Sequence, residues 1–140
     1  IHKLLVTFAD RCHHGKEEVV LFPALAGHRD IVADLLREHV LGRRQVRAMG
    51  KAIAESSSGD VSAERSFADH ARKYSRLIRA HIEKEDNHAF PLAERELSEE
   101  RKAVLLEQFE EIEEKRIGAG GHRQLAESLD DLYGRFIISP

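Results

Sequence analysis

Two segments of the sequence carry the same ionisable residues at the same spacing: HHGKEEVVLFP, which begins at His13, and HIEKEDNHAFP, which begins at His81. In each, a glutamate follows the histidine by four residues (Glu17 and Glu85), and Phe-Pro ends the segment. On a helix, residues four apart lie one turn apart on the same face. An imidazole and a carboxylate held in this way suit iron, zinc or manganese. The repeat therefore supplies two pairs of candidate metal ligands.

Helical phase separates the four ionisable residues at the start of the first segment. At about 100° per residue, His13 and Glu17 share a stripe with apolar residues such as Val20. His14 and Glu18 lie about 100° or more from that stripe, so both are expected to face outward, solvated or at the edge of a site. A carboxylate in an apolar stripe is costly unless it is paired or bound to a metal. His13 and Glu17 are thus the predicted inward residues.

A further histidine, His39, lies on an apolar face of the following segment, together with Leu35 and Val46. A lone inward histidine is usually a hydrogen-bonded core residue, and a lone His/Glu pair is usually a surface pair worth a few tenths of a kcal/mol. The duplicated pairs and His39 together favour a metal site. Five such ligands are too many for one tetrahedral zinc ion and too few to fill two octahedral ions. Open positions of this kind would suit a small ligand such as O2.

The elements that must position these residues are predicted to be helices, because Leu, Ala, Glu, Arg and Lys dominate and no useful strand pattern occurs. Pro23 and Pro91 are each expected to end a helix or to start a new turn. Short connections between long amphipathic helices favour an up-down bundle, in which the two His/Glu pairs can lie at one level. The helices are predicted at about 1–21, 30–56, 61–87, 98–116 and 122–137.

Composition narrows the possible settings of such a bundle. The chain has 140 residues and a net charge of −3 with interleaved signs, which favours neither nucleic acid nor an anionic membrane surface as a partner. No apolar run approaches the roughly 20 residues that span a bilayer. The single cysteine, Cys12, excludes an intramolecular disulfide and fits a reducing, cytoplasmic location. Because the chain begins at Ile1 within an apolar-periodic segment, an N-terminal piece is expected to be missing.

The sequence resembles the hemerythrin-like (HHE cation-binding) family. The residues that carry the resemblance are HHGKEEVVLFP, the dipeptide Glu38–His39 and HIEKEDNHAFP, and the tail EEIEEKRIGAGGHRQL is similar to one bacterial subgroup. The resemblance implies an all-α, up-down four-helix bundle. Its metal-binding helices would lie in residues 1–96, and residues 97–140 would form a C-terminal helical extension that packs on the same domain.

The resemblance also implies a cofactor and its ligands. The family holds a non-haem di-iron centre, so two iron ions with an oxo or carboxylate bridge are expected, ahead of zinc or manganese. Glu17 and Glu85 are the candidate bridges. The ligands carried over from the family motif are His13, Glu17, His39, His81 and Glu85.

This sequence departs from the family pattern at two places. The family's leading helix carries another histidine ligand without a counterpart here, so the first helix is expected to be absent or replaced, with His122 and Glu113 as candidate substitutes. Where oxygen carriers have a second histidine, this chain has Arg43, which would pair with a carboxylate or stabilise anionic oxygen. Tyr74 and His14 are weaker candidates for the surroundings of the metal. A phenol such as Tyr74 more often serves ordinary core packing.

Three functions remain open from the sequence. The first is a binding module that senses O2 or nitric oxide, or handles iron. The second is a peroxidase or catalase-like di-iron enzyme, in which the metal rather than a side-chain nucleophile would do the chemistry. The third is a helical interaction protein with a vestigial site. The expected partners are a small diatomic or peroxide ligand, and a homodimer is compatible with the sequence.

Overall fold

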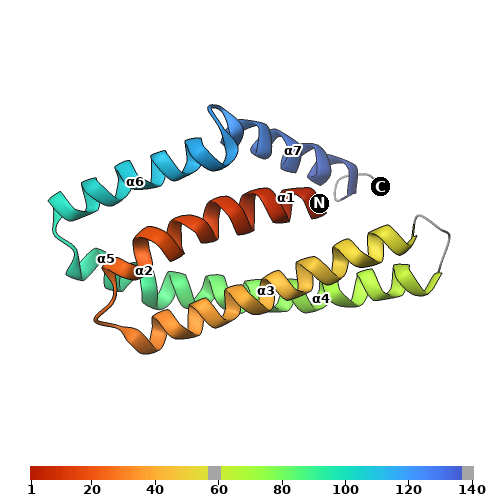
Figure 1. Cartoon of the computed structure of the whole chain (residues 1–140), viewed down its shortest axis with the longest axis horizontal. Coiled ribbons are helices and arrows are strands. Elements are labelled where there is room, and N and C mark those ends of the chain that lie inside the picture. Colours follow the sequence, from red (N-terminus) through yellow and green to blue (C-terminus); the bar gives the residue numbers. More distant parts are fainter. Residues whose placement is uncertain (57–60, 137–140) are drawn as a thin grey trace.

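The computed structural model describes residues 1–56 and 61–136, and the elements in these ranges are all helical (Figure 1). This confirms the predicted all-α class. The first helix, residues 2–24, combines α-helical turns with two stretches of wider π-helix, labelled η. In chain order the elements are α1 (His2–Leu4), η1 (Leu5–His14), η2 (Glu17–Leu21), α2 (Phe22–Ala24), α3 (Arg29–Ser56), α4 (Val61–Lys84), η3 (Glu85–Ala89), α5 (Phe90–Glu96), α6 (Glu99–Ile117) and α7 (Gly121–Phe136).

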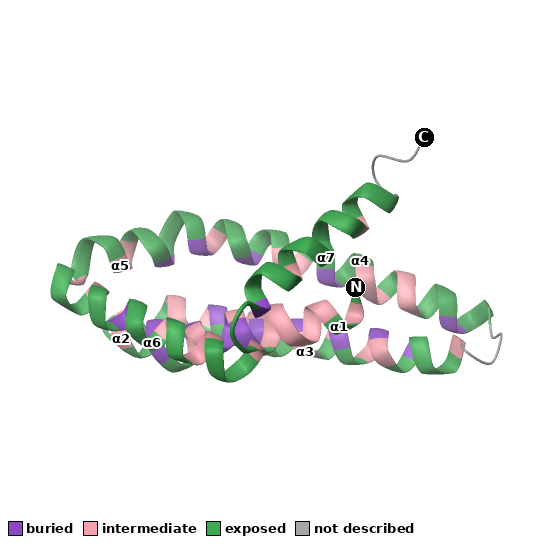
Figure 2. Ribbon diagram, turned by 90° about the horizontal axis from the view of Figure 1, so that it is seen from above, coloured by how far each residue is buried: buried purple, intermediate pink, exposed green. Residues whose placement is uncertain are grey.

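The long helices form an up-down bundle. Helices α3 and α4 pack along each other as a hairpin, and the first helix lies between this hairpin and α6 (Figure 1). Beyond α6 the chain turns at Gly118, whose φ of 77° lies in the left-handed region that glycine adopts without strain. Helix α7 then projects from the bundle with most of its surface exposed (Figure 2). The bundle therefore brings the first helix, α3 and α4 together around a common interior.

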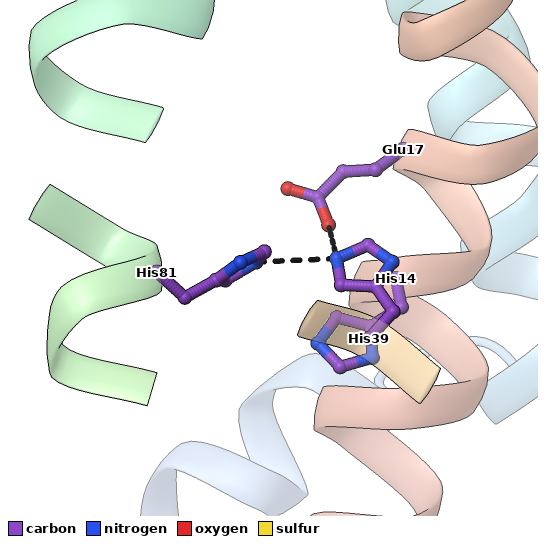
Figure 3. Close-up of side chains that lie close together, drawn as sticks. All are labelled: His14, Glu17, His39 and His81. Carbon is purple, nitrogen blue, oxygen red and sulfur yellow. Dashed lines mark hydrogen bonds and ion pairs between the residues drawn. The ribbon is translucent and has the colours of Figure 1, made fainter. Parts of the chain in front are cut away.

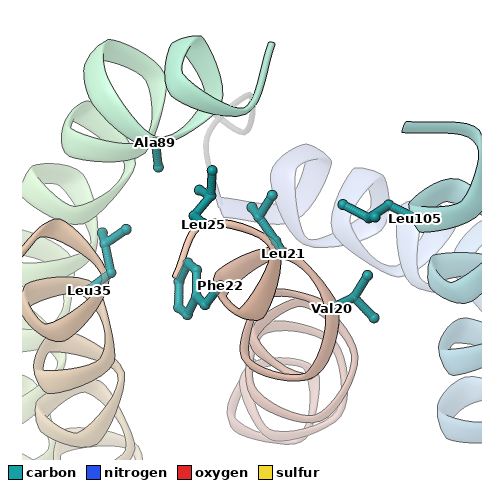
Figure 4. Close-up of a cluster of buried hydrophobic side chains, with 7 residues drawn as sticks. All are labelled: Val20, Leu21, Phe22, Leu25, Leu35, Ala89 and Leu105. Atoms are coloured by element: carbon teal, nitrogen blue, oxygen red, sulfur yellow. The ribbon is translucent and has the colours of Figure 1, made fainter. Parts of the chain in front are cut away.

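Two apolar clusters hold the bundle together. The first gathers the residues around the Phe-Pro ends of both repeats (Figure 4): Val20, Leu21, Phe22, Leu25, Leu35, Ala89 and Leu105. Because Leu105 belongs to α6, this helix shares the core of the helices that precede it. The second cluster joins Val46, Met49 and Tyr74. Along α3, His39 falls between Leu35 of the first cluster and Val46 of the second, which explains its burial.

Of the two outcomes predicted for each Phe-Pro step, the end of a helix or the start of a new turn, the structure has the second. A π-helical turn, η2 or η3, directly precedes each step, and the proline then lies in the first turn of α2 or α5. Proline lacks an N–H group, so the continuous helix omits one backbone hydrogen bond at each of these positions. The wider π turn also relieves the clash of the proline ring with the preceding carbonyls. The helix predicted to end at about 87 consequently runs to Glu96, whereas the first helix does stop at Ala24.

None of the helices in the described residues combines the length and the apolar character that a membrane-spanning helix requires.

Candidate metal centre

Five ionisable side chains are buried where the first helix, α3 and α4 meet. None of them exposes more than 3% of its surface. Figure 3 shows Glu17 and three imidazoles from these helices converging on one point. The inward orientation predicted for Glu17, His39, His81 and Glu85 is confirmed by their burial. The five buried residues are His14, Glu17, His39, His81 and Glu85.

These side chains form two groups with the spacing of metal ligands. His14, Glu17, His39 and His81 offer ligand atoms that all lie within 4.8 Å of one another. A second group with the same spacing consists of His13, Glu17 and Glu85. Glu17 belongs to both groups. Its Oε1 lies 3.4 Å from Nε2 of His13, and its Oε2 lies 3.4 Å from Nε2 of His39. The carboxylate thus presents one oxygen to each group.

The prediction that His14 faces outward is wrong. Its side chain is buried, and its ring stacks on that of His39 with centroids 3.8 Å apart and an interplanar angle of 16°. His13, by contrast, is predicted to face inward with Glu17 but keeps 43% of its side chain exposed. The prediction assumed the rotation of an α-helix, but Leu5–His14 is a π-helix, in which each residue turns the chain through a smaller angle. The wider turn lets both neighbouring histidines approach the interior.

Carboxylates orient two of the buried imidazoles. Nδ1 of His39 lies 2.7 Å from Oε1 of Glu18, and Nδ1 of His81 lies 2.9 Å from Oε2 of Glu38. With an Nδ1–H that donates to the carboxylate, each ring turns its Nε2 lone pair toward the interior. The two Nε2 atoms lie 3.1 Å apart. Metal-binding histidines are commonly held in this way, which fixes the ring and raises its basicity.

Cations in turn hold both of these carboxylates. Arg43 donates to Glu18 at 2.8 Å and also pairs with Asp10, while Lys84 pairs with Glu38. Burial alone would raise the pKa of Glu18, but the hydrogen bonds from Arg43 and His39 hold it below its ordinary value. The expectation that Arg43 pairs with a carboxylate is confirmed.

Sequence reasoning missed the roles of Glu38 and Lys84. The signal for Glu38 is the dipeptide Glu38–His39, in which a carboxylate directly precedes the inward histidine. Neighbouring residues on an α-helix point in different directions. His39 therefore enters the interior while Glu38 reaches across to His81 on α4.

Several buried polar atoms in the site have no hydrogen-bond partner: both ring nitrogens of His14, both carboxylate oxygens of Glu17 and Oε1 of Glu85. An unsatisfied buried polar group costs roughly 1–3 kcal/mol, so five such atoms within one cluster need a compensating interaction. Imidazole nitrogens and carboxylate oxygens together form the donor set of divalent transition metals. The residues present therefore fit a metal site.

Burial also shifts the proton affinities in the cluster. It raises the pKa of Glu17 to about 9, assisted by the negative charge of Glu85. Burial lowers the pKa of His14 to about 2, assisted by the positive charge that His39 and His13 would carry. At neutral pH and without a metal, Glu17 is thus protonated and His14 is neutral. The imidazole of His14 has a free lone pair, whereas Glu17 must lose a proton to act as a ligand.

The remaining candidate residues lie outside both groups. Tyr74 packs in the second apolar cluster, as ordinary core packing predicts. His122 is 62% exposed and lies 3.4 Å from Glu113, which also pairs with Lys16. The structure therefore does not bring His122 and Glu113 to the buried cluster. The thiol of Cys12 is buried, and this burial raises its pKa.

Comparison with known proteins identifies the family of this chain. Residues 1–93 match the model of the hemerythrin HHE cation binding domain. Curated proteins that resemble the chain include an uncharacterized protein of Mycobacterium bovis and one of Mycobacterium tuberculosis strain CDC 1551. Each is 26% identical to it over 133 residues, covering 93% of this chain and 52% of the relative. The chain thus spans about half the length of the curated relatives it matches. No solved structure matches it significantly. With two thirds of its length matched by the family model, the chain belongs to the hemerythrin HHE cation-binding family.

Proposed function

We propose that this chain is a non-haem di-iron protein that binds O2, nitric oxide or peroxide at the buried His/Glu site, in oxygen or redox sensing or in iron handling. The observation that carries the proposal is the position of Glu17, with one oxygen directed to each of two ligand groups. A carboxylate in this position suits a bridge between two ions. The proposed ligands taken from the family motif are His13, Glu17, His39, His81 and Glu85.

Iron is proposed because mixed imidazole and carboxylate donors suit it and because the family implies it. Bound iron would supply reversible binding or reduction of a small oxidant. The chain itself contributes buried apolar side chains on both sides of the imidazoles. Glu18 and Glu38 hold His39 and His81 in fixed orientations, so the rings need little rearrangement on binding.

A di-iron peroxidase or catalase-like enzyme is the alternative function. It is favoured by the exposure of His13, which keeps 43% of its side chain in contact with solvent. In this alternative, a small oxidant and its product would exchange with solvent beside His13, as turnover requires. The opposite side of the site is closed, because His39 and His81 are almost completely buried.

Exposure of the reduced, iron-loaded protein to O2 tests these functions. Reversible binding predicts an absorption band that appears with O2 and disappears when O2 is removed, whereas the enzyme predicts peroxide consumption over many turnovers. Replacement of His81 by alanine should abolish either activity, because it removes an inward imidazole that Glu38 holds in place. His88→Ala is the matched control, since His88 lies on the same continuous helix and is exposed. Iron-loaded protein that does neither would contradict both proposals.

A further inference from the structure

We propose that the adjacent histidines of this chain bind different metal ions. His14 would bind one ion together with Glu17, His39 and His81, and His13 would bind the other together with Glu17 and Glu85. This assignment rests on the proposed two-ion site. It adds His14 to the ligands expected from the family motif, and it divides the ligands between an inner ion and an outer ion.

The surroundings of His14 exclude the ordinary role of a hydrogen-bonded core histidine. Both of its ring nitrogens are buried without a hydrogen-bond partner. The nearest carboxylate, Asp10, lies 3.8 Å from its Nδ1, which is too far for a hydrogen bond, and Asp10 already pairs with Arg43. The ring instead stacks on His39, a member of the same group. A metal ion would satisfy a nitrogen that nothing else in the described protein satisfies.

The geometry of the first helix permits neighbouring histidines to serve neighbouring ions. In an α-helix the side chains of adjacent residues diverge by about 100°, but η1 is a π-helix with a smaller rotation per residue. The rings of His13 and His14 have centroids 5.8 Å apart and an interplanar angle of 44°. Two ions that share a bridging carboxylate lie roughly 3.5–4 Å apart. The spacing of the rings suits one on each ion.

The two groups differ in accessibility, which gives the assignment a measurable consequence. The inner group is buried throughout, and Glu18 and Glu38 hold two of its imidazoles. In the outer group His13 is partly exposed, and its ring lies against Phe8 at a centroid distance of 6.5 Å. A chelator in solution should therefore remove the outer ion faster than the inner ion.

Metal retention in matched variants tests this division. The protein is loaded with Fe²⁺ without oxygen, and the iron that remains per chain is measured at intervals after a chelator is added. Wild type should lose one ion quickly and one slowly. His14→Ala should lack the slowly removed ion, whereas His13→Ala should retain it and lack the fast one. His122→Ala, which changes an exposed histidine outside both groups, should behave as wild type.

Folding is checked by circular dichroism, and His14→Gln is made alongside because it keeps a polar side chain without an imidazole. The inference is overturned if either His14 variant, when folded, retains both ions with wild-type kinetics. Loss of the slow ion in His13→Ala, with its retention in His14→Ala, would also overturn it. Wild type that binds no iron would refute the proposed function itself, and the assignment with it.

Discussion

Replacement of Glu17 by alanine should remove both metal ions from the protein. Glu17 is the one residue shared by the two ligand groups, and its two oxygens face His13 and His39 separately. Even residues that only orient a metal ligand typically cost about 10–100-fold in metal affinity when they are changed. Loss of a ligand shared by both ions should exceed that range, so the metal content should fall to near zero. Metal analysis of the purified variant measures it.

Two further carboxylate variants test whether the loss of metal is specific to Glu17. Glu85→Ala should retain more metal than Glu17→Ala, because Glu85 is a member of the outer group only, although its Oε1 lies 3.1 Å from Nε2 of His81 in the inner group. Asp86→Ala should retain both, since Asp86 is the exposed neighbour of Glu85 and lies in neither group. Equal metal contents in Glu17→Ala and Asp86→Ala would show that Glu17 is not a ligand.

The variant Glu17→Gln distinguishes an effect on folding stability from the loss of a metal ligand. In the metal-free protein at pH 7 Glu17 is already uncharged, because burial raises its pKa to about 9. A neutral amide of similar size should therefore change the free energy of unfolding of the metal-free protein by no more than about 1 kcal/mol. Metal-free Glu17→Gln and metal-free wild type should melt within a few degrees of each other, while only wild type gains stability from metal.

The metal affinity of the protein should depend strongly on pH, and metal should bind more tightly as the pH rises from 6 to 9. Binding requires the carboxylate form of Glu17, whose pKa is about 9, so a proton is released when metal binds near neutrality. Affinity should then rise by about tenfold per pH unit for each proton released. Burial lowers the pKa of His14 to about 2, so this residue contributes no proton in that range.

The stability of the metal-free protein should respond in the opposite direction through Glu17. A raised pKa means that the folded state holds this proton more tightly than the unfolded chain does. The resulting stabilisation is fully present below the ordinary pKa of 4.5 and is lost as the pH rises through about 9. The increase in melting temperature caused by added Mn²⁺ should therefore grow from pH 6 to pH 8. An increase that is the same at both pH values, or smaller at pH 8, would contradict protonated Glu17 in the metal-free site.

Much of the site could be predicted from the sequence because the repeat and the helical phase agree. The spacing of four residues identified Glu17, His81 and Glu85, and the apolar face of α3 identified His39; all four are buried. The same spacing identified His13, which keeps 43% of its side chain exposed. The prediction that His14 faces outward is wrong because helical phase is calculated with the same rotation angle for every residue. The π-helical hydrogen bonding of Leu5–His14 changes that rotation, and no residue type in the segment signals it.

Contacts between segments far apart in the chain could not be predicted from the sequence. Glu38 and His81 lie 43 residues apart, and their contact depends on how α3 packs on α4. The position of α6 beside the first helix likewise depends on packing between segments that are far apart in the sequence. His122 and Glu113 were proposed as substitute ligands on residue type alone, but the turn after α6 leaves them in contact with each other at the surface.

The number of iron ions bound by the whole protein tests the central claim most directly. Protein produced with its complete chain and loaded with Fe²⁺ without oxygen should contain about two irons per chain after removal of loosely bound metal. That result is expected because two ligand groups share Glu17. Normally folded protein that binds no metal, or that binds one ion regardless of loading, would contradict the account.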